Sequence, residues 1–325
     1  MRQRATSSLS LITSVPLFYL VVFVSAVPVS DASSASSDSA RRSYERGVTL
    51  FREGNADGAI EALKKAVAQN PKLAEAYHVL GLVYFQSKRN PDEAIQAYKQ
   101  SLKLGPASAE ILNDLADVYL AQGRGSDAEG VLRQALDIAP GNEEAHLDLA
   151  HLYEARHDRA NALKMYQSLL RVRPDHAEAL YHLASLYDSH GDLKLAREYL
   201  SRLTQANPGH ADAWYLLGRL AERGNDLNAA AAAFKEAIAV KADLVDAHYN
   251  LGFVYRSQGL LAEAEREFLE VIRYRPEYAE AHLNLGMVYT SLNRLEEAEK
   301  EHERAVALKP QSAEAHYNLG VFYEL

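Results

Sequence analysis

Apolar and small residues recur along residues 40–325 with a period of 34 residues. In the sixth unit, positions 4, 7, 8 and 11 are Trp214, Leu217, Gly218 and Ala221. The spacing i, i+3, i+4, i+7 places such side chains on one face of an α-helix. The second unit is one residue longer than the others, and the ninth ends after its first helix. The units begin at Ala40, Ala74, Ala109, Glu143, Ala177, Ala211, Val245, Ala279 and Ala313.

A second helix is predicted in each complete unit. It carries alanine at position 20, a large apolar or aromatic residue four positions later in most units, and usually proline at position 32, which ends the helix. We expect the small residue at position 8 to face the alanine at position 20. The extra residue of the second unit is expected in the turn at residues 89–91. A left-handed residue is expected to end the first helix at Gly54, Gly123, Gly191, Gly259 and Asn293.

One helical hairpin cannot bury its apolar face alone, so each unit must stack on the next. The predicted fold is therefore all-α, a solenoid of antiparallel helix pairs with eight complete repeats and one half repeat. Residues 40–325 form this array.

Over residues 40–325 the repeated pattern resembles that of the tetratricopeptide repeat (TPR) family. It consists, in order, of an aromatic residue, Leu, Gly, Tyr, Ala, a second aromatic residue, Ala and Pro. This resemblance implies a right-handed superhelix whose first helices line a concave groove that binds peptides or partner domains. The line His-Leu-Asn-Leu-Gly at residues 282–286 is similar to repeats of O-linked N-acetylglucosamine transferases. In those enzymes a ladder of asparagines holds substrate chains.

Positions 2, 6, 9 and 13 of the first helix lie roughly opposite its apolar face. Asparagine amides at position 6 can donate to and accept from an extended peptide backbone, although solvated amides of a repeat consensus are the alternative. Tyrosines at position 5 offer contact area with a polar tip, or else pack on the neighbouring helix. The candidate groove residues are Asp114, Asp148, His182, Asn250, Asn284 and Asn318 at position 6, and Tyr181, Tyr215 and Tyr249 at position 5.

Position 2 is acidic in every unit except the first, as in Glu144 and Glu178. A carboxylate in the first turn is favoured by the helix dipole, and this is the simpler explanation. The functional alternative is an acidic stripe that selects basic partners.

The N-terminal residues indicate export. Residues 1–26 combine a basic start, an apolar stretch and the small-x-small site Val24-Ser25-Ala26, which is typical of a cleaved signal peptide. An uncleaved membrane anchor is the alternative, and it would be the chain's only contact with a membrane. Residues 27–39 are rich in Ser and Ala and predict a flexible linker.

The composition and motifs argue against several kinds of functional site. The chain has no cysteine, which excludes disulfides and thiolate sites, and its net charge of −9 argues against nucleic acid as the main partner. We find no catalytic or nucleotide-binding motif and expect no cofactor. His248, His282 and His316 recur at position 4 but lie too far apart to share one ion, and His146 and His151 diverge around their helix, so no metal site is expected.

The sequence thus predicts an exported, non-catalytic adaptor that binds a protein segment or partner domain. A substrate-docking region of a glycosyltransferase without its catalytic domain is the alternative. Self-association is a third possibility, because the final helix presents Val321, Phe322 and Leu325.

Overall fold

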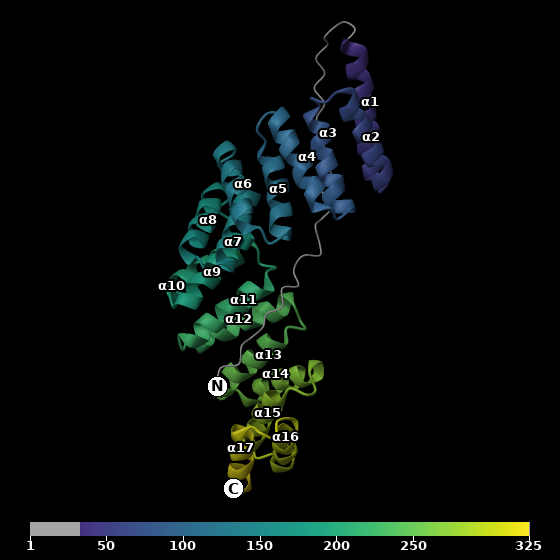
Figure 1. The fold of residues 1–325 in the computed structure, drawn as a ribbon. Helices are drawn as coiled ribbons and strands as arrows, with labels where there is room; N and C mark the ends of the chain where they lie inside the picture. The colour runs from purple at the N-terminus through teal and green to yellow at the C-terminus, as the bar shows by residue number, and fades with distance from the viewer. Residues whose placement is uncertain (1–32, 325) are drawn as a thin grey trace.

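A computed structural model describes residues 33–324. The predicted signal peptide at residues 1–26 and the first part of the predicted linker lie outside these residues. Seventeen α-helices follow one another in antiparallel pairs along an elongated array, with α1 and α17 at opposite ends (Figure 1). The first helices of the repeats are α1 (Ser33–Arg52), α3 (Ala74–Leu82), α5 (Ala109–Ala121), α7 (Glu143–Ala155), α9 (Ala177–His190), α11 (Ala211–Arg223), α13 (Val245–Ser257), α15 (Ala279–Ser291) and α17 (Ala313–Tyr323). The second helices are α2 (Ala56–Gln69), α4 (Pro91–Leu104), α6 (Gly125–Ile138), α8 (Arg159–Val172), α10 (Leu193–Ala206), α12 (Leu227–Val240), α14 (Leu261–Tyr274) and α16 (Leu295–Leu308).

Each second helix packs between the first helix of its own repeat and the first helix of the next. The core therefore consists of apolar clusters that follow one another along the array, in which Tyr98, Tyr166, Phe234 and Phe268 are fully buried. This arrangement confirms the predicted solenoid of eight complete repeats and one half repeat. Among residues 33–324, no helix is both long and apolar enough to cross a membrane.

The glycine at position 8 makes room for a ring on the second helix. A Cβ added to Gly218 would lie 2.5 Å from the ring of Phe234, and one added to Gly252 would lie 2.9 Å from the ring of Phe268. In these two repeats the ring at position 24 supplies the atoms nearest to position 8, whereas in the first repeat a Cβ added to Gly47 would lie 3.3 Å from the carbonyl oxygen of Ala59 at position 20. The large residue at position 24 fills the space, because its ring reaches across to the first helix.

The turns between paired helices follow the predicted pattern, with one correction. The backbone dihedral φ is positive at all five predicted residues, and also at Arg89, His157 and Asn225. In the second repeat, however, the extra residue does not enlarge the turn at residues 89–91. It is absorbed in a π-helical segment, η1 (Val83–Ser87), whose wider winding is seen in the bond from the Lys88 amide to the Val83 carbonyl.

Helix α1 starts earlier than the repeat pattern predicts. It begins at Ser33, so residues 33–39, assigned to the flexible linker, are helical. Ala40 is buried, and the Gln69 amide on α2 donates to the Ser39 hydroxyl at 2.9 Å. These contacts with α2 explain why the helix continues beyond the first repeat toward the N-terminus.

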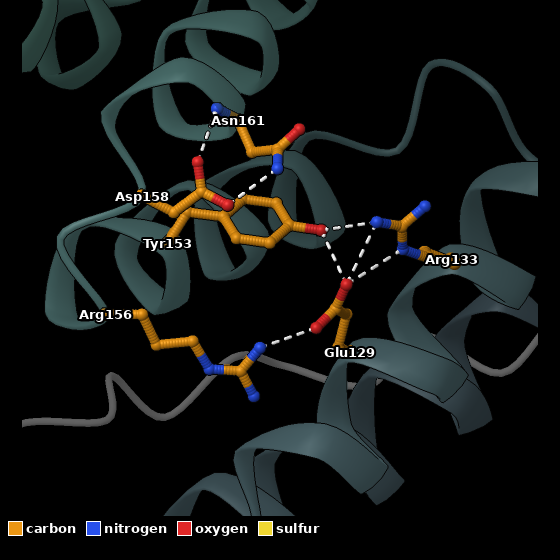
Figure 2. A network of polar contacts seen from close by, with 6 residues as sticks. All are labelled: Glu129, Arg133, Tyr153, Arg156, Asp158 and Asn161. Carbon is orange, nitrogen blue, oxygen red and sulfur yellow. Dashed lines mark hydrogen bonds and ion pairs between the residues drawn. The ribbon is translucent and has the colours of Figure 1, made fainter.

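Polar networks tie neighbouring repeats together. Figure 2 shows Glu129 of α6 between three donors: Arg133 on the same helix, the Tyr153 hydroxyl on α7, and Arg156 just after α7. The Glu129 carboxylate accepts from the Tyr153 hydroxyl at 2.9 Å and from Arg156 at 2.6 Å. Burial alone would raise the pKa of Glu129, but these hydrogen bonds outweigh it and lower the pKa.

Candidate functional site

Side chains at positions 2, 5, 6 and 9 connect successive first helices. We call the surface they form the first-helix face. For example, the His78 ring on α3 lies 2.6 Å from the Asp114 carboxylate on α5, and the Asn113 amide on α5 donates to Glu144 on α7 at 2.7 Å. The candidate residues predicted from the sequence lie on this face in two groups, one on α5, α7 and α9 and the other on α11, α13, α15 and α17.

The first group contains carboxylates that crowd one another. Burial raises the pKa of Asp117 to about 7, and the neighbouring carboxylates act in the same direction. Burial and the nearby Glu144 raise the pKa of Asp148 to about 6. Oδ2 of Asp148 is buried and has no hydrogen-bond partner among the described residues. Apart from His151, which acts to lower the pKa of Asp148, the charged groups that act on these two carboxyls are carboxylates.

Asp114 differs from its two neighbours because it is paired with His78. The part of the acidic group whose pKa values are raised is thus Asp117 and Asp148. Asp117 stands at position 9 and was not selected from the sequence. The signal that identifies it is its acidic side chain on the predicted groove face, one helical turn after Asp114.

A mixed cluster of histidines and carboxylates joins α7 to α9. Nε2 of His151 lies 3.3 Å from the Glu178 carboxylate, and Nδ1 of His182 lies 3.2 Å from the Glu154 carboxylate. The Tyr166 hydroxyl on α8 donates to Glu154 at 2.8 Å. The rings of His151 and His182 are 5.1 Å apart between centroids.

Electrostatics couple the members of this cluster. The contact with Glu178 raises the pKa of His151 in spite of its burial, and the same contact lowers the pKa of Glu178. Burial would raise the pKa of Glu154, but hydrogen bonds from His182 and Tyr166 lower it overall. The histidine and carboxylate charges therefore stabilise each other.

The second group consists of tyrosine–asparagine pairs. The Asn250 amide donates to the Tyr215 hydroxyl at 3.3 Å, and the Asn284 amide donates to the Tyr249 hydroxyl at 3.2 Å. Each pair links position 5 of one repeat to position 6 of the next. Asn284 is only 7% exposed, and its amide also donates to the Glu280 carbonyl.

Two predicted residues lack such a pair. The Asn318 amide donates to the Glu314 carbonyl within its own helix, because position 5 of the preceding repeat is Leu283. The Tyr181 ring stacks on His210 with centroids 5.4 Å apart. Whether the three asparagines grip a peptide backbone stays a prediction.

Two of the histidines at position 4, His248 and His282, are buried and each contacts a carboxylate and a backbone carbonyl. His248 is 6% exposed, with Nδ1 2.6 Å from Glu267 and Nε2 3.0 Å from the Ala242 carbonyl. His282 makes the equivalent contacts with Glu301 and Pro276. Burial would lower the pKa of His248, but its carboxylate and carbonyl partners raise it overall.

Comparison with known families supports the repeat assignment. Tetratricopeptide repeat models match residues 154–220 and 249–313, and a TPR repeat model matches residues 222–259. The model of the Cilia and flagella-associated protein 70 C-terminal domain matches residues 25–171. No glycosyltransferase model is among these four matches, so the likeness of residues 282–286 to those enzymes gains no support. No curated protein matches the chain.

Solved structures share the architecture. The C-terminal part of a TPR repeat-containing protein from Cytophaga hutchinsonii aligns with a TM-score of 0.57 at 16% identity, over 85% of this chain and 99% of that one. YrrB, described as a TPR protein with an unusual peptide-binding site, aligns with a TM-score of 0.53 at 21% identity, over 57% and 96%. PilF of Pseudomonas aeruginosa aligns with a TM-score of 0.51 at 21% identity, over 64% and 94%. At identities this low, the structural likeness establishes a shared fold alone.

Proposed function

Because this chain is a tetratricopeptide repeat protein, we propose that it is a non-catalytic scaffold that binds a basic, extended segment of a partner protein on its first-helix face. Proteins built of these repeats typically mediate protein–protein interactions. The observation that supports a basic partner is the pair Asp117 and Asp148, whose carboxyls are crowded and whose charged neighbours are carboxylates except for His151 beside Asp148.

A lysine or arginine placed between these two carboxyls would relieve their mutual repulsion. An acidic segment would meet repulsion from the same groups. Charge complementarity of this kind selects the partner and speeds its association.

The test is fluorescence anisotropy of the full chain with a dye-labelled peptide rich in Lys and Gly, against the same peptide with Glu in place of Lys. We expect only the basic peptide to bind, and the double variant Asp117→Asn, Asp148→Asn to weaken binding. Asp137→Asn is the matched control, because Asp137 is an exposed carboxylate on the second helix α6. Binding should also fall as salt is added.

Two results would contradict the proposal. One is equal binding of the basic and acidic peptides. The other is unchanged affinity of the double variant. Both substitutions preserve shape and remove charge repulsion, so loss of binding cannot be ascribed to unfolding.

We propose in addition that the tyrosine–asparagine pairs extend this binding surface toward the C-terminal repeats. Replacing Asn250, Asn284 and Asn318 together by Ala should then weaken partner binding and leave the helical content intact. Circular dichroism measures the second quantity. Full affinity in the triple variant would show that these amides serve only to join neighbouring helices.

Export is a separate proposal, based on the apolar and small residues of the first 26 positions. Mass spectrometry of the mature chain should find its N-terminus at Val27. An intact Met1 in the isolated protein would leave only the alternative of an uncleaved anchor or no export.

Self-association through α17 is also a proposal, because this helix leaves Tyr317 71% exposed, together with Val321 and Tyr323. The mass of the unaltered chain in solution should then rise with protein concentration. The mass of the variant Tyr317→Ser should not. A mass that is independent of concentration would refute it.

A further inference from the structure

The histidine–carboxylate cluster between α7 and α9 brings together three side chains of the types that bind transition metals. His151, Glu178 and His182 each offer one ligand atom, and these atoms lie within 4.8 Å of one another. Glu178 and His182 are four residues apart on α9, so both point to the same side of that helix, toward His151 on α7. We propose that these three residues form a Zn²⁺ site on the first-helix face.

The distances suit this ion after a small adjustment. Zinc binds imidazole nitrogen and carboxylate oxygen at about 2.0–2.2 Å, so the ligand atoms of a tetrahedral site lie about 3.3 Å apart. His151 and Glu178 already meet this spacing at 3.3 Å. The other ligand-atom separations are at most 4.8 Å, so a small shift of the side chains would complete the set.

The surroundings of His182 resemble the outer shell of known zinc sites. Metal-binding histidines usually present their second ring nitrogen to a carboxylate, which fixes the ring and increases its basicity. Nδ1 of His182 faces Glu154 at 3.2 Å, and Tyr166 holds that carboxylate with a hydrogen bond. Nε2 of His182 is then the nitrogen available to the ion.

The donor set also decides which metal is favoured. Two imidazoles and one carboxylate, with no thiolate, are typical of zinc sites that keep an open fourth position for water or an added ligand. Calcium and magnesium prefer sites made of oxygen atoms only. The open position would face the surface on which we place the partner, although the zinc proposal does not depend on that partner.

The buried histidines at position 4 differ from this cluster. His248 and His282 each use both ring nitrogens in contacts with a carboxylate and a backbone carbonyl. His151 and His182 belong to neighbouring repeats and sit at positions 9 and 6, which the packing of α7 beside α9 brings together. The sequence argument compared His151 only with His146 on its own helix and did not consider His182 of the next repeat.

The test is titration of the full, tag-free chain with Zn²⁺ in competition with a chromogenic chelator, followed by Co²⁺ substitution and visible spectroscopy. We expect one ion per chain and the visible absorption of a low-symmetry Co²⁺ centre. His151→Ala and Glu178→Gln should each weaken Zn²⁺ binding by more than the roughly 10–100-fold that loss of an outer-shell partner costs. Glu154→Gln should weaken it within about that range.

His190→Ala is the matched control, because His190 is an exposed histidine on the same helix α9. It should leave binding unchanged. Glu178→Gln keeps the shape of the side chain, and circular dichroism will verify that each variant remains helical. The proposal is overturned if the unaltered chain binds no Zn²⁺, or if His151→Ala and Glu178→Gln bind it as tightly as the unaltered chain.

Discussion

Asp117→Asn should stabilise the protein, and the gain should grow with pH. The carboxyl of Asp117 has its pKa raised from 3.8 to about 7, first by burial and then by the carboxylates of Asp148, Glu144 and Asp114. At pH values between 3.8 and about 7, the carboxyl of Asp117 holds a proton in the folded chain that it has lost in the unfolded chain. The contribution of this proton to stability is complete below about pH 4 and is lost as the pH rises to about 7.

The magnitude follows from the shift. A displacement of about three units at 1.36 kcal/mol per unit gives a ceiling of about 4 kcal/mol above neutral pH. Asp148 shares the repulsion and titrates together with Asp117, so the cost cannot be assigned to one residue alone. We therefore expect a gain of about 1–3 kcal/mol at about pH 8, and less than half of that at about pH 5.

Urea unfolding of Asp117→Asn and of the unaltered chain at both pH values measures this gain. Comparison at each pH cancels the titration of groups that the two chains share. Asp137→Asn, on the exposed side of α6, should show no such pH-dependent gain. A loss of stability in Asp117→Asn at about pH 8, or the same gain at both pH values, would refute the reasoning about crowded carboxyls.

Three further changes test other parts of the structure. Gly218→Ala should cost about 1–3 kcal/mol in unfolding free energy, because its Cβ would press on the buried ring of Phe234, whereas Gly320→Ala should cost nothing, because it has open space around it. Glu129→Gln should destabilise the chain in urea at neutral pH and have less effect in acid, because the lowered pKa of Glu129 means that its contribution is lost as the pH falls. His248→Gln should show the opposite dependence and cost more at about pH 6 than at about pH 8, because the raised pKa of His248 gives stability that is lost as the pH rises.

Each of these three predictions has a result that would contradict it. Equal costs at Gly218 and Gly320 would mean that the ring at position 24 does not occupy the space at position 8. A Glu129→Gln effect that grows in acid would reverse the sign of its hydrogen-bond contribution. A pH-independent effect of His248→Gln would mean that its contacts do not favour the charged ring.

The repeat period was sufficient to predict the fold because packing of identical hairpins leaves few alternatives. From the second unit onward, the first helix of each repeat begins at the first residue of the unit defined from the sequence. The period did not reveal how far a side chain reaches. A helical wheel gives the direction of Gly218 but not the length of the side chain opposite, so it does not show that the ring of Phe234 supplies the nearest atoms.

The candidate site was predicted only in part, for a related reason. The sequence places His182 and Asp148 on one face, but whether His151 meets His182 depends on the rotation between neighbouring repeats. The protonation of Asp117 depends on its burial and on charges from α7, and neither quantity can be read from one helix. Contacts of this kind have to be sought by comparing positions in neighbouring repeats, such as position 9 of one unit with position 6 of the next.

The π-helical segment η1 has a consequence for how this protein tolerates changes in length. One residue inserted into a regular α-helix rotates everything after it by about 100°, which would turn the following helix away from the stack. In the second repeat the wider winding of η1 takes up that residue, and Arg89 still adopts the positive φ seen at the end of the other first helices. Helix α4 therefore enters the array in phase with its counterparts. The repeating unit is thus maintained along this chain as a geometric step between helices and not as a fixed number of residues, and the first helix of the second repeat accommodates one extra residue without shifting the helix that follows.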